Sequence, residues 1–119
     1  MKGTVIYEVK DGVALLTVDN PPVNPLSDGV RTGLHDSLIK AEEDDSVVGV
    51  VLTGNGRAFI AGADISEFGK EPKGPSLFEV QDIMENSSKP VIAAIHGTAL
   101  GGGLEVALTC HYRIAVKSK

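Results

Sequence analysis

The 119-residue sequence has no tryptophan, one cysteine, three phenylalanines and two tyrosines. A single cysteine excludes an internal disulfide and is typical of a reducing compartment. Because aromatic residues are scarce, the hydrophobic core has to be mainly aliphatic. Lys and Arg never stand side by side, and the formal net charge is −5. A nucleic-acid-binding protein normally carries a basic stripe, so the sequence predicts no nucleic-acid partner.

Long apolar runs are also missing, and none approaches the ~18 residues that a membrane-spanning helix needs. The first ten residues, MKGTVIYEVK, alternate apolar and polar side chains and contain no apolar core of a signal peptide. They are therefore expected to form a strand. The length fits one domain, residues 1–119, of a soluble intracellular protein.

The pattern of apolar residues and turn signals predicts an α/β fold with crossover connections. Two β-rich runs, 4–9 and 13–18, flank Asp11-Gly12, which indicates a hairpin. A helix is expected from Ser27 as N-cap, with Val30, Leu34, Leu38 and Ala41 on one face. A strand buried on both faces is expected at 47–52 and a buried strand at 91–95, and a short helix at 76–85 separates them. A helix at 104–110 and a strand at 111–116 complete the expected order.

Two glycine-bearing turns are the candidate functional segments, 59–65 and 99–105. Glycine allows backbone N–H groups to converge on a ligand, and a helix that starts there adds its positive dipole end. Such turns bind anions or oxyanions, or else they simply allow a helix and a strand to pack closely. The P-loop, the dinucleotide fingerprint and the serine-hydrolase elbow are all absent from the sequence.

Glu105 follows Gly102 by three residues, so its carboxylate is expected on the same helix face as the second turn. The apolar residues around it would desolvate the carboxylate and raise its pKa, which suits proton transfer near neutral pH. The alternative is a glutamate that only favours the helix N-terminus. Asp64 similarly reads as the N-cap of a helix beginning at Ile65, in preference to a catalytic group.

Other polar residues give weaker signals. His96 and His111 lack Cys, Asp or Glu at ligand spacing, so no metal site is predicted. The acidic run 42–45 reads as a solvated helix end. Cys110 lies in an apolar stretch and reads as a buried core residue, not a nucleophile.

Four segments together resemble the crotonase superfamily, the enoyl-CoA hydratase/isomerase group, and they occur in that family's order. They are 20–24 (NPPVN), 59–65 (FIAGADI), 89–97 (KPVIAAIHG) and 99–105 (ALGGGLE). The continuation at 108–115, LTCHYRIA, is most similar to the hydratase part of the multifunctional enzymes of fatty-acid β-oxidation, which also carry a 3-hydroxyacyl-CoA dehydrogenase.

The resemblance implies a fold of repeated ββα units forming a spiral, assembled as trimers or dimers of trimers. It implies that the backbone N–H groups of Ala63 and Gly102 form an oxyanion hole for the thioester carbonyl of an acyl-CoA. Residues Ala61, Gly62, Ala63 and Asp64 would line the CoA site, and Glu105 would be one of two catalytic glutamates. No cofactor is implied, because coenzyme A enters as part of the substrate.

The implied reaction is hydration of a 2-enoyl-CoA to a 3-hydroxyacyl-CoA. A 3,2-enoyl-CoA isomerase, another crotonase reaction, or a non-catalytic acyl-CoA-binding or assembly module are the alternatives. In the family pattern the second glutamate falls beyond Lys119, so the chain is expected to be the N-terminal portion of a longer enzyme. The expected compartment is the bacterial cytoplasm, or the peroxisome in a eukaryote.

Overall fold

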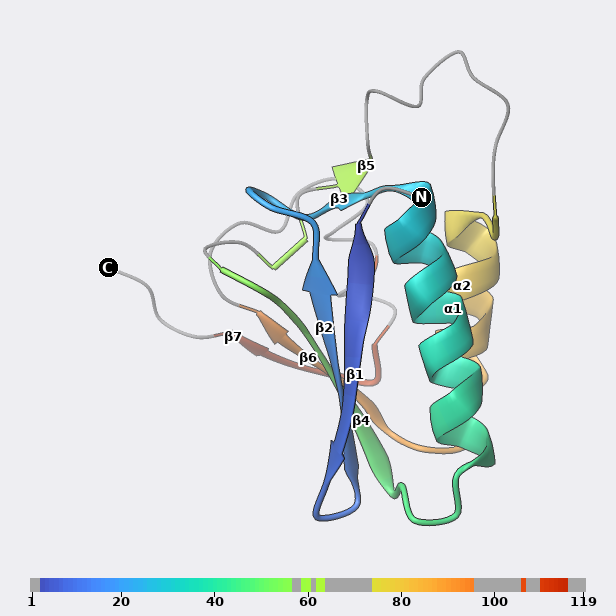
Figure 1. The fold of residues 1–119 in the computed structure, drawn as a ribbon. Helices are drawn as coiled ribbons and strands as arrows, with labels where there is room; N and C mark the ends of the chain where they lie inside the picture. The colour runs from blue at the N-terminus through green and yellow to red at the C-terminus, as the bar shows by residue number, and fades with distance from the viewer. Residues whose placement is uncertain are drawn as a thin grey trace.

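A computed structural model describes residues 3–56, 59–60, 62–63, 74–95, 106 and 110–115. Its strands are β1 (Thr4–Lys10), β2 (Val13–Asp19), β3 (Pro25–Leu26), β4 (Gly49–Gly54), β5 (Gly62–Ala63), β6 (Val91–Ile95) and β7 (Tyr112–Ala115). The helices are α1 (Asp28–Glu43) and α2 (Leu77–Glu85). Strands β1, β2, β4, β6 and β7 form one sheet in that order, and β3 pairs with β5 in a second, smaller sheet (Figure 1).

The predicted hairpin is confirmed. Strand β1 pairs antiparallel with β2, in a register that runs from Thr4 opposite Asp19 to Lys10 opposite Val13. Asp11 and Gly12 form the turn with φ values of 52° and 81°. Both values lie in the left-handed region that Asp tolerates and Gly adopts freely, which is the reason that this pair makes a two-residue turn.

The other strands of the large sheet run parallel, β2 to β4, β4 to β6 and β6 to β7. Strand β4 begins at Gly49, two residues later than predicted, and continues through Gly54, two residues beyond the predicted end. The reason is that the backbone N–H groups of Val47 and Val48 bond to Asp44 O and Gly12 O, at 2.9 and 2.7 Å, in the connection before the strand.

The helices predicted from Ser27 and at 76–85 are both present. Ser27 caps α1 through its hydroxyl, which accepts from Val30 N, and Ser76 caps α2 in the same way through Glu79 N. The predicted face of α1 (Val30, Leu34, Leu38 and Ala41) is buried. Helix α2 adds Val80 and Met84, which are both fully buried.

Helices α1 and α2 lie side by side on one face of the large sheet (Figure 1). Side chains of β4 accordingly alternate, with Val50 and Leu52 buried and Val51 and Thr53 half-buried. The prediction that this strand is buried on both faces is wrong within the described residues, because they place a helix layer on one face only. The buried core of the described residues is aliphatic, as expected, except for Phe59, Met84 and Cys110.

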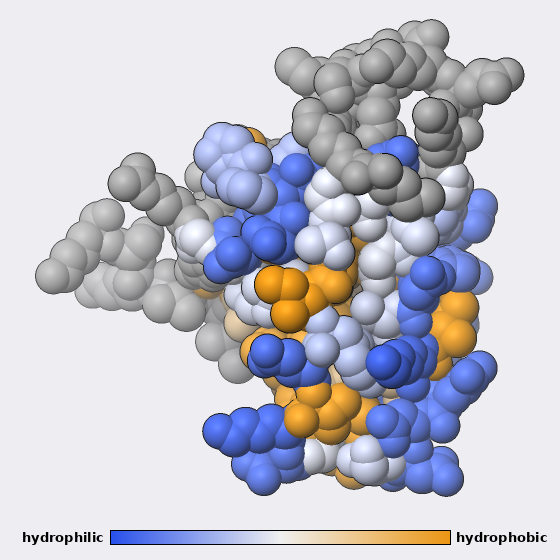
Figure 2. Space-filling model, viewed as in Figure 1, coloured by the Kyte–Doolittle hydropathy of each residue, from blue (hydrophilic) through white to orange (hydrophobic). Residues whose placement is uncertain are grey.

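The surface seen from the β1 side is mostly hydrophilic, with hydrophobic patches over β1 (Figure 2). Ile6 and Val9 of β1 are 40% and 41% exposed. No helix in the described part of the chain is long and apolar enough to span a membrane. The helices predicted to start at Ile65 and to run from 104 to 110 fall mostly outside the described residues, although Val106 is helical.

Candidate functional site

The first glycine turn is described at its centre. Gly62 and Ala63 form strand β5, which pairs in parallel with β3, so that Pro25 lies opposite Gly62 and Leu26 opposite Ala63. Ala61, Asp64, Gly102 and Glu105 lie outside the described residues. Of the predicted site, the structure therefore fixes the backbone of the two central residues of the first turn and the strand beside it.

Strand β3 is short because Pro25 is its first residue and the capping Ser27 directly follows its second, yet polar groups hold it firmly. The carbonyl oxygen of Pro25 accepts from Asn20 Nδ2 at 3.1 Å and from Ser27 N at 2.9 Å. The carbonyl oxygen of Leu26 accepts from Arg31 Nη1 at 2.7 Å. Arg31 also donates from Nε to the carbonyl oxygen of Pro75, at 3.0 Å, just before α2. One arginine of α1 thus links β3 to the start of the second helix.

Asn20, Asn24 and Ser27 form a buried polar cluster beside β3, and their exposed fractions are 5%, 0% and 0%. Asn20 N donates to Asn24 Oδ1 at 2.9 Å, and Asn24 N donates back to Asn20 O at 2.9 Å. Asn20 Nδ2 also donates to Ser27 Oγ at 3.2 Å. Since Ser27 caps α1, the cluster joins the end of β2, strand β3 and the first turn of the helix.

The same cluster reaches the glycine turn through Asn24. Its Nδ2 donates to Asn55 O at 3.0 Å and to Phe59 O at 3.3 Å. Phe59 and Ile60, the first two residues of the turn, are fully buried. The path of the chain into Gly62 and Ala63 is therefore set by core packing on one side and by the Asn24 amide on the other.

Sequence reasoning missed this cluster as a functional feature. It used 20–24 only as one of the four segments that carry the family resemblance. The available signal was a pair of asparagines four residues apart in a proline-rich segment next to an N-cap. Buried amides need hydrogen-bond partners, so such a pair indicates a local polar network when the flanking elements enter the core.

The second glycine turn lies between described elements. Strand β6 precedes it, and Val106, which follows Glu105, is helical and fully buried. Cys110 Sγ donates to the carbonyl oxygen of Val106 at 3.4 Å. His111 Nδ1 accepts from Val91 N at 2.9 Å, which ties the start of β7 to the start of β6.

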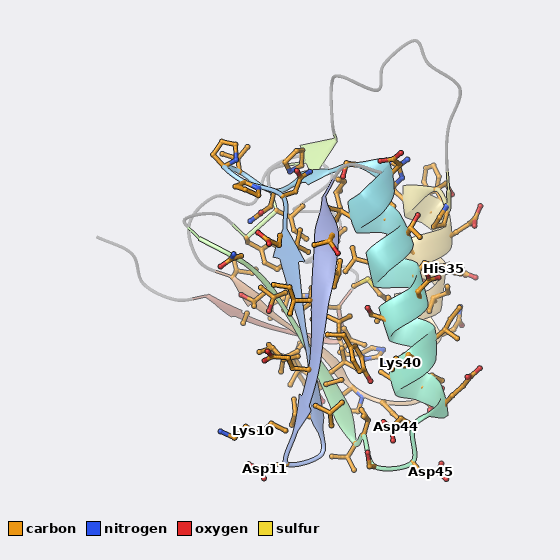
Figure 3. All side chains as sticks on the ribbon, in the orientation of Figure 1. Lys10, Asp11, His35, Lys40, Asp44 and Asp45 are labelled. Atoms are coloured by element: carbon orange, nitrogen blue, oxygen red, sulfur yellow. The ribbon has the colours of Figure 1, made fainter. Side chains whose placement is uncertain are left out.

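Two carboxylates with lowered pKa values, those of Glu42 and Asp44, lie at the far end of α1 from β5. The Ser88 hydroxyl and N–H lower the pKa of Glu42, and the Ser46 hydroxyl and N–H lower that of Asp44. Figure 3 shows Asp44 and Asp45 in the loop after α1, away from β5. The acidic run is a helix end on the surface, as predicted. Within the described residues, no group of three or more His, Cys, Asp or Glu could hold a metal.

Comparison with known proteins decides the family. A model of the enoyl-CoA hydratase/isomerase family matches residues 8–119. The chain belongs to the enoyl-CoA hydratase/isomerase family. The resemblance drawn from the four sequence segments is therefore confirmed.

Curated relatives of this hydratase/isomerase chain include multifunctional enzymes. The peroxisomal bifunctional enzyme of Danio rerio is 51% identical over 92% of this chain and 15% of its own length. A glyoxysomal fatty acid β-oxidation multifunctional protein of Cucumis sativus is 45% identical over 96% of this chain and 17% of its own. A "probable enoyl-CoA hydratase" of Bacillus subtilis is 46% identical over 88% of this chain and 43% of its own length. The chain spans less than half the length of each of these three relatives.

Solved structures of enoyl-CoA hydratases confirm the crotonase-like α/β fold. An enoyl-CoA hydratase/carnithine racemase from Magnetospirillum magneticum matches with a TM-score of 0.86 and 30% identity, over 94% of this chain and 46% of that one. An enoyl-CoA hydratase from Polaromonas sp. matches with a TM-score of 0.86 and 28% identity, over 95% of this chain and 48% of that one. The chain thus superposes on about half of each solved hydratase.

Proposed function

We propose that this chain carries the oxyanion-binding part of an acyl-CoA site that hydrates a 2-enoyl-CoA to a 3-hydroxyacyl-CoA. The observation that carries the proposal is the β3–β5 pairing, which holds the backbone of Ala63 opposite Leu26 in a member of the hydratase family. The names of the relatives support fatty-acid β-oxidation as the setting.

In the proposed mechanism, addition of water to the double bond builds negative charge on the thioester oxygen. The backbone N–H groups of Ala63 and Gly102 donate to that oxygen. Loss of one such donor from comparable sites costs about 3 kcal/mol in the transition state. Glu105 orients the water and transfers a proton. Ala61 to Asp64 lines the CoA part of the substrate, and no resident cofactor takes part.

Calorimetric titration of the 119-residue chain with acetoacetyl-CoA tests this proposal. The enolate of this compound carries the charge that the two N–H groups are proposed to hold. Saturable binding is expected in the unchanged chain, and Gly102→Val should abolish it by blocking backbone approach. Gly49→Ala, in β4, is the control. Absence of binding to a folded chain would refute an oxyanion site in these residues.

Turnover separates the reaction types. A hydratase converts a 2-enoyl-CoA to the 3-hydroxy product, an isomerase converts a 3-enoyl-CoA to the 2-enoyl isomer, and a binding module does neither. Glu105→Gln should leave acetoacetyl-CoA binding intact and remove hydration. Equal hydration by the variant would exclude Glu105 as the proton-transfer group.

Assembly and compartment belong to the same proposal. We expect trimers or dimers of trimers, which light scattering would distinguish from a monomer. For the compartment, relatives named as peroxisomal and glyoxysomal support the peroxisome in a eukaryote, while the bacterial cytoplasm remains our expectation for a bacterial source.

A further inference from the structure

The side chain of Asn24 bonds to the main chain at three points, two of which are distant from it in sequence. Its amide bonds to Asn20 at the end of β2, to Asn55 after β4, and to Phe59 before β5. The last two partners lie 31 and 35 residues away. Its side chain is completely buried. A buried amide that bonds to the main chain at these three points restricts how far they can move relative to one another.

The chemistry of the contacts requires an asparagine. Oδ1 faces an N–H donor, whereas Nδ2 faces two carbonyl oxygens, so the two ends of the amide cannot exchange. The backbone of Asn24 has φ of 56°, a left-handed conformation in which Asn is enriched. Aspartate would present an oxygen to two carbonyl oxygens, and a larger amide would not fit the same backbone position.

Asn24 also acts on β5 from both sides of the pairing. Its backbone leads directly into β3, the strand opposite Gly62 and Ala63. Its side chain fixes the carbonyl group of Phe59, four residues before Ala63 in the chain. Movement of this one amide would therefore shift β5 and its partner strand together.

We propose that Asn24 is a positioning residue that sets the backbone of Ala63 for the thioester oxyanion. This inference rests on the proposed function, since it gives the placement of Ala63 a catalytic purpose. Asn24 does not contact the substrate in this proposal. It acts through the chain path from Phe59 to Ala63. Misplacement of an oxyanion donor by about 1 Å is sufficient to cost ~100-fold in rate.

Amide hydrogen exchange tests the positioning role without any substrate. In Asn24→Asp and Asn24→Gly, exchange at Gly62 and Ala63 should accelerate about tenfold or more relative to Val51 and Leu52 of β4. The glycine variant tolerates the positive φ, so it keeps the backbone conformation while removing the amide.

Asn55→Ala is the matched control. The Asn55 side chain is exposed and donates to Asp19 Oδ1 at 3.1 Å. Loss of this side chain should leave exchange at β5 unchanged, because the bond from Asn24 goes to the Asn55 carbonyl oxygen. Equal acceleration in β4 and β5, or global unfolding of both Asn24 variants, would overturn the proposal, because Asn24 would then stabilise the whole fold.

A kinetic measurement tests whether the Asn24 amide affects catalysis. With a 2-enoyl-CoA, Asn24→Gly should lower kcat about 10- to 100-fold with little change in KM. An unchanged kcat together with faster β5 exchange would show that Asn24 does not position Ala63 for catalysis, and would overturn the proposal. If the unchanged chain neither binds acetoacetyl-CoA nor turns over, the proposed function fails, and the exchange experiment still decides whether Asn24 positions Ala63.

Discussion

Gly33 of α1 lies against Val5 of β1 so closely that a Cβ atom built on Gly33 would stand 2.8 Å from Val5 Cγ2 and 3.1 Å from Val5 N. The helix crosses the edge strand at this point, with backbone against backbone. A glycine in the interior of a 16-residue helix lowers the helix propensity of the sequence. At this position, however, the missing side chain is what allows α1 to pack closely on the sheet.

Gly33→Ala is therefore expected to destabilise the chain, although alanine favours helix formation. Overpacking against a strand backbone costs about 1–3 kcal/mol, more than the ~1 kcal/mol gained in helix propensity. Urea unfolding followed by circular dichroism measures the change. Gly49→Ala is the control, since its Cβ would meet nothing closer than 3.7 Å. A Gly33→Ala variant as stable as the unchanged chain would show that α1 can move away from β1.

Lys89 provides a second test. Its ammonium group donates to the carbonyl oxygens of Ala41 and Asp44, both at 2.6 Å, and so satisfies the C-terminal end of α1 from the segment before β6. Lys89→Met keeps the apolar stem and removes the charge and both hydrogen bonds. We expect a loss of about 1.5–3 kcal/mol in the free energy of unfolding.

The control for Lys89 is Lys10→Met at the hairpin, whose side chain points away from the body of the molecule (Figure 3). A surface change of this kind should stay within about 0.5 kcal/mol. Equal losses in the two variants would mean that the removal of any positive charge from this acidic chain is destabilising, and that the helix-end contact is not the cause.

The elements that sequence predicted well are those with a repeated local signal. The hairpin follows from Asp11-Gly12 between alternating runs, and α1 follows from Ser27 and an apolar residue every three or four positions. Strand β4 shifted because Val47 and Val48 are apolar, yet their N–H groups bond outside the sheet. An apolar run does not reveal where its backbone hydrogen bonds go.

In the candidate site, too, only the features with a local sequence signal could be predicted. The first glycine turn could be singled out because glycine, an apolar run and an acidic residue stand next to each other in sequence. Strands β3 and β5 could not be predicted, because two residues are too few to show an alternation of apolar and polar side chains. The contacts of Asn24 with Asn55 and Phe59 depend on segments more than thirty residues apart, which only the folded chain brings together.

At Tyr7 of β1 we expect a substitution to stabilise the chain, unlike those at Gly33 and Lys89. Its hydroxyl is buried and has no hydrogen-bond partner among the described residues, and burial raises its pKa. The Lys40 ammonium lies 4.6 Å from the ring centroid, a contact that phenylalanine would keep. Tyr7→Phe should raise the free energy of unfolding by about 1 kcal/mol. Tyr112→Phe, at a side chain that is 64% exposed, should change nothing measurable. Destabilisation by Tyr7→Phe would show that the hydroxyl makes a favourable bond in solution.

Cys110 predicts how stability depends on pH. Burial raises the pKa of its thiol to about 12, against a small opposing effect of Arg113. The native thiol therefore stays protonated at pH values where the unfolded thiol, with a pKa near 9.0, has ionised. The contribution of the buried thiol is fully present below pH 9 and is lost as pH rises toward 12.

Between these limits, the unchanged chain should lose stability faster than Cys110→Ala, by up to about 1.4 kcal/mol for each pH unit. Parallel urea titrations of both proteins from pH 8 to about 10 measure this difference in slope. Lysines and tyrosines also titrate in this range, but their contributions are the same in both proteins and do not affect the difference. The same burial should keep the native thiol unreactive toward a disulfide reagent at pH 8 and release one reactive thiol on unfolding. Identical pH slopes in the two proteins, or rapid labelling of the folded chain, would show that Cys110 is open to solvent.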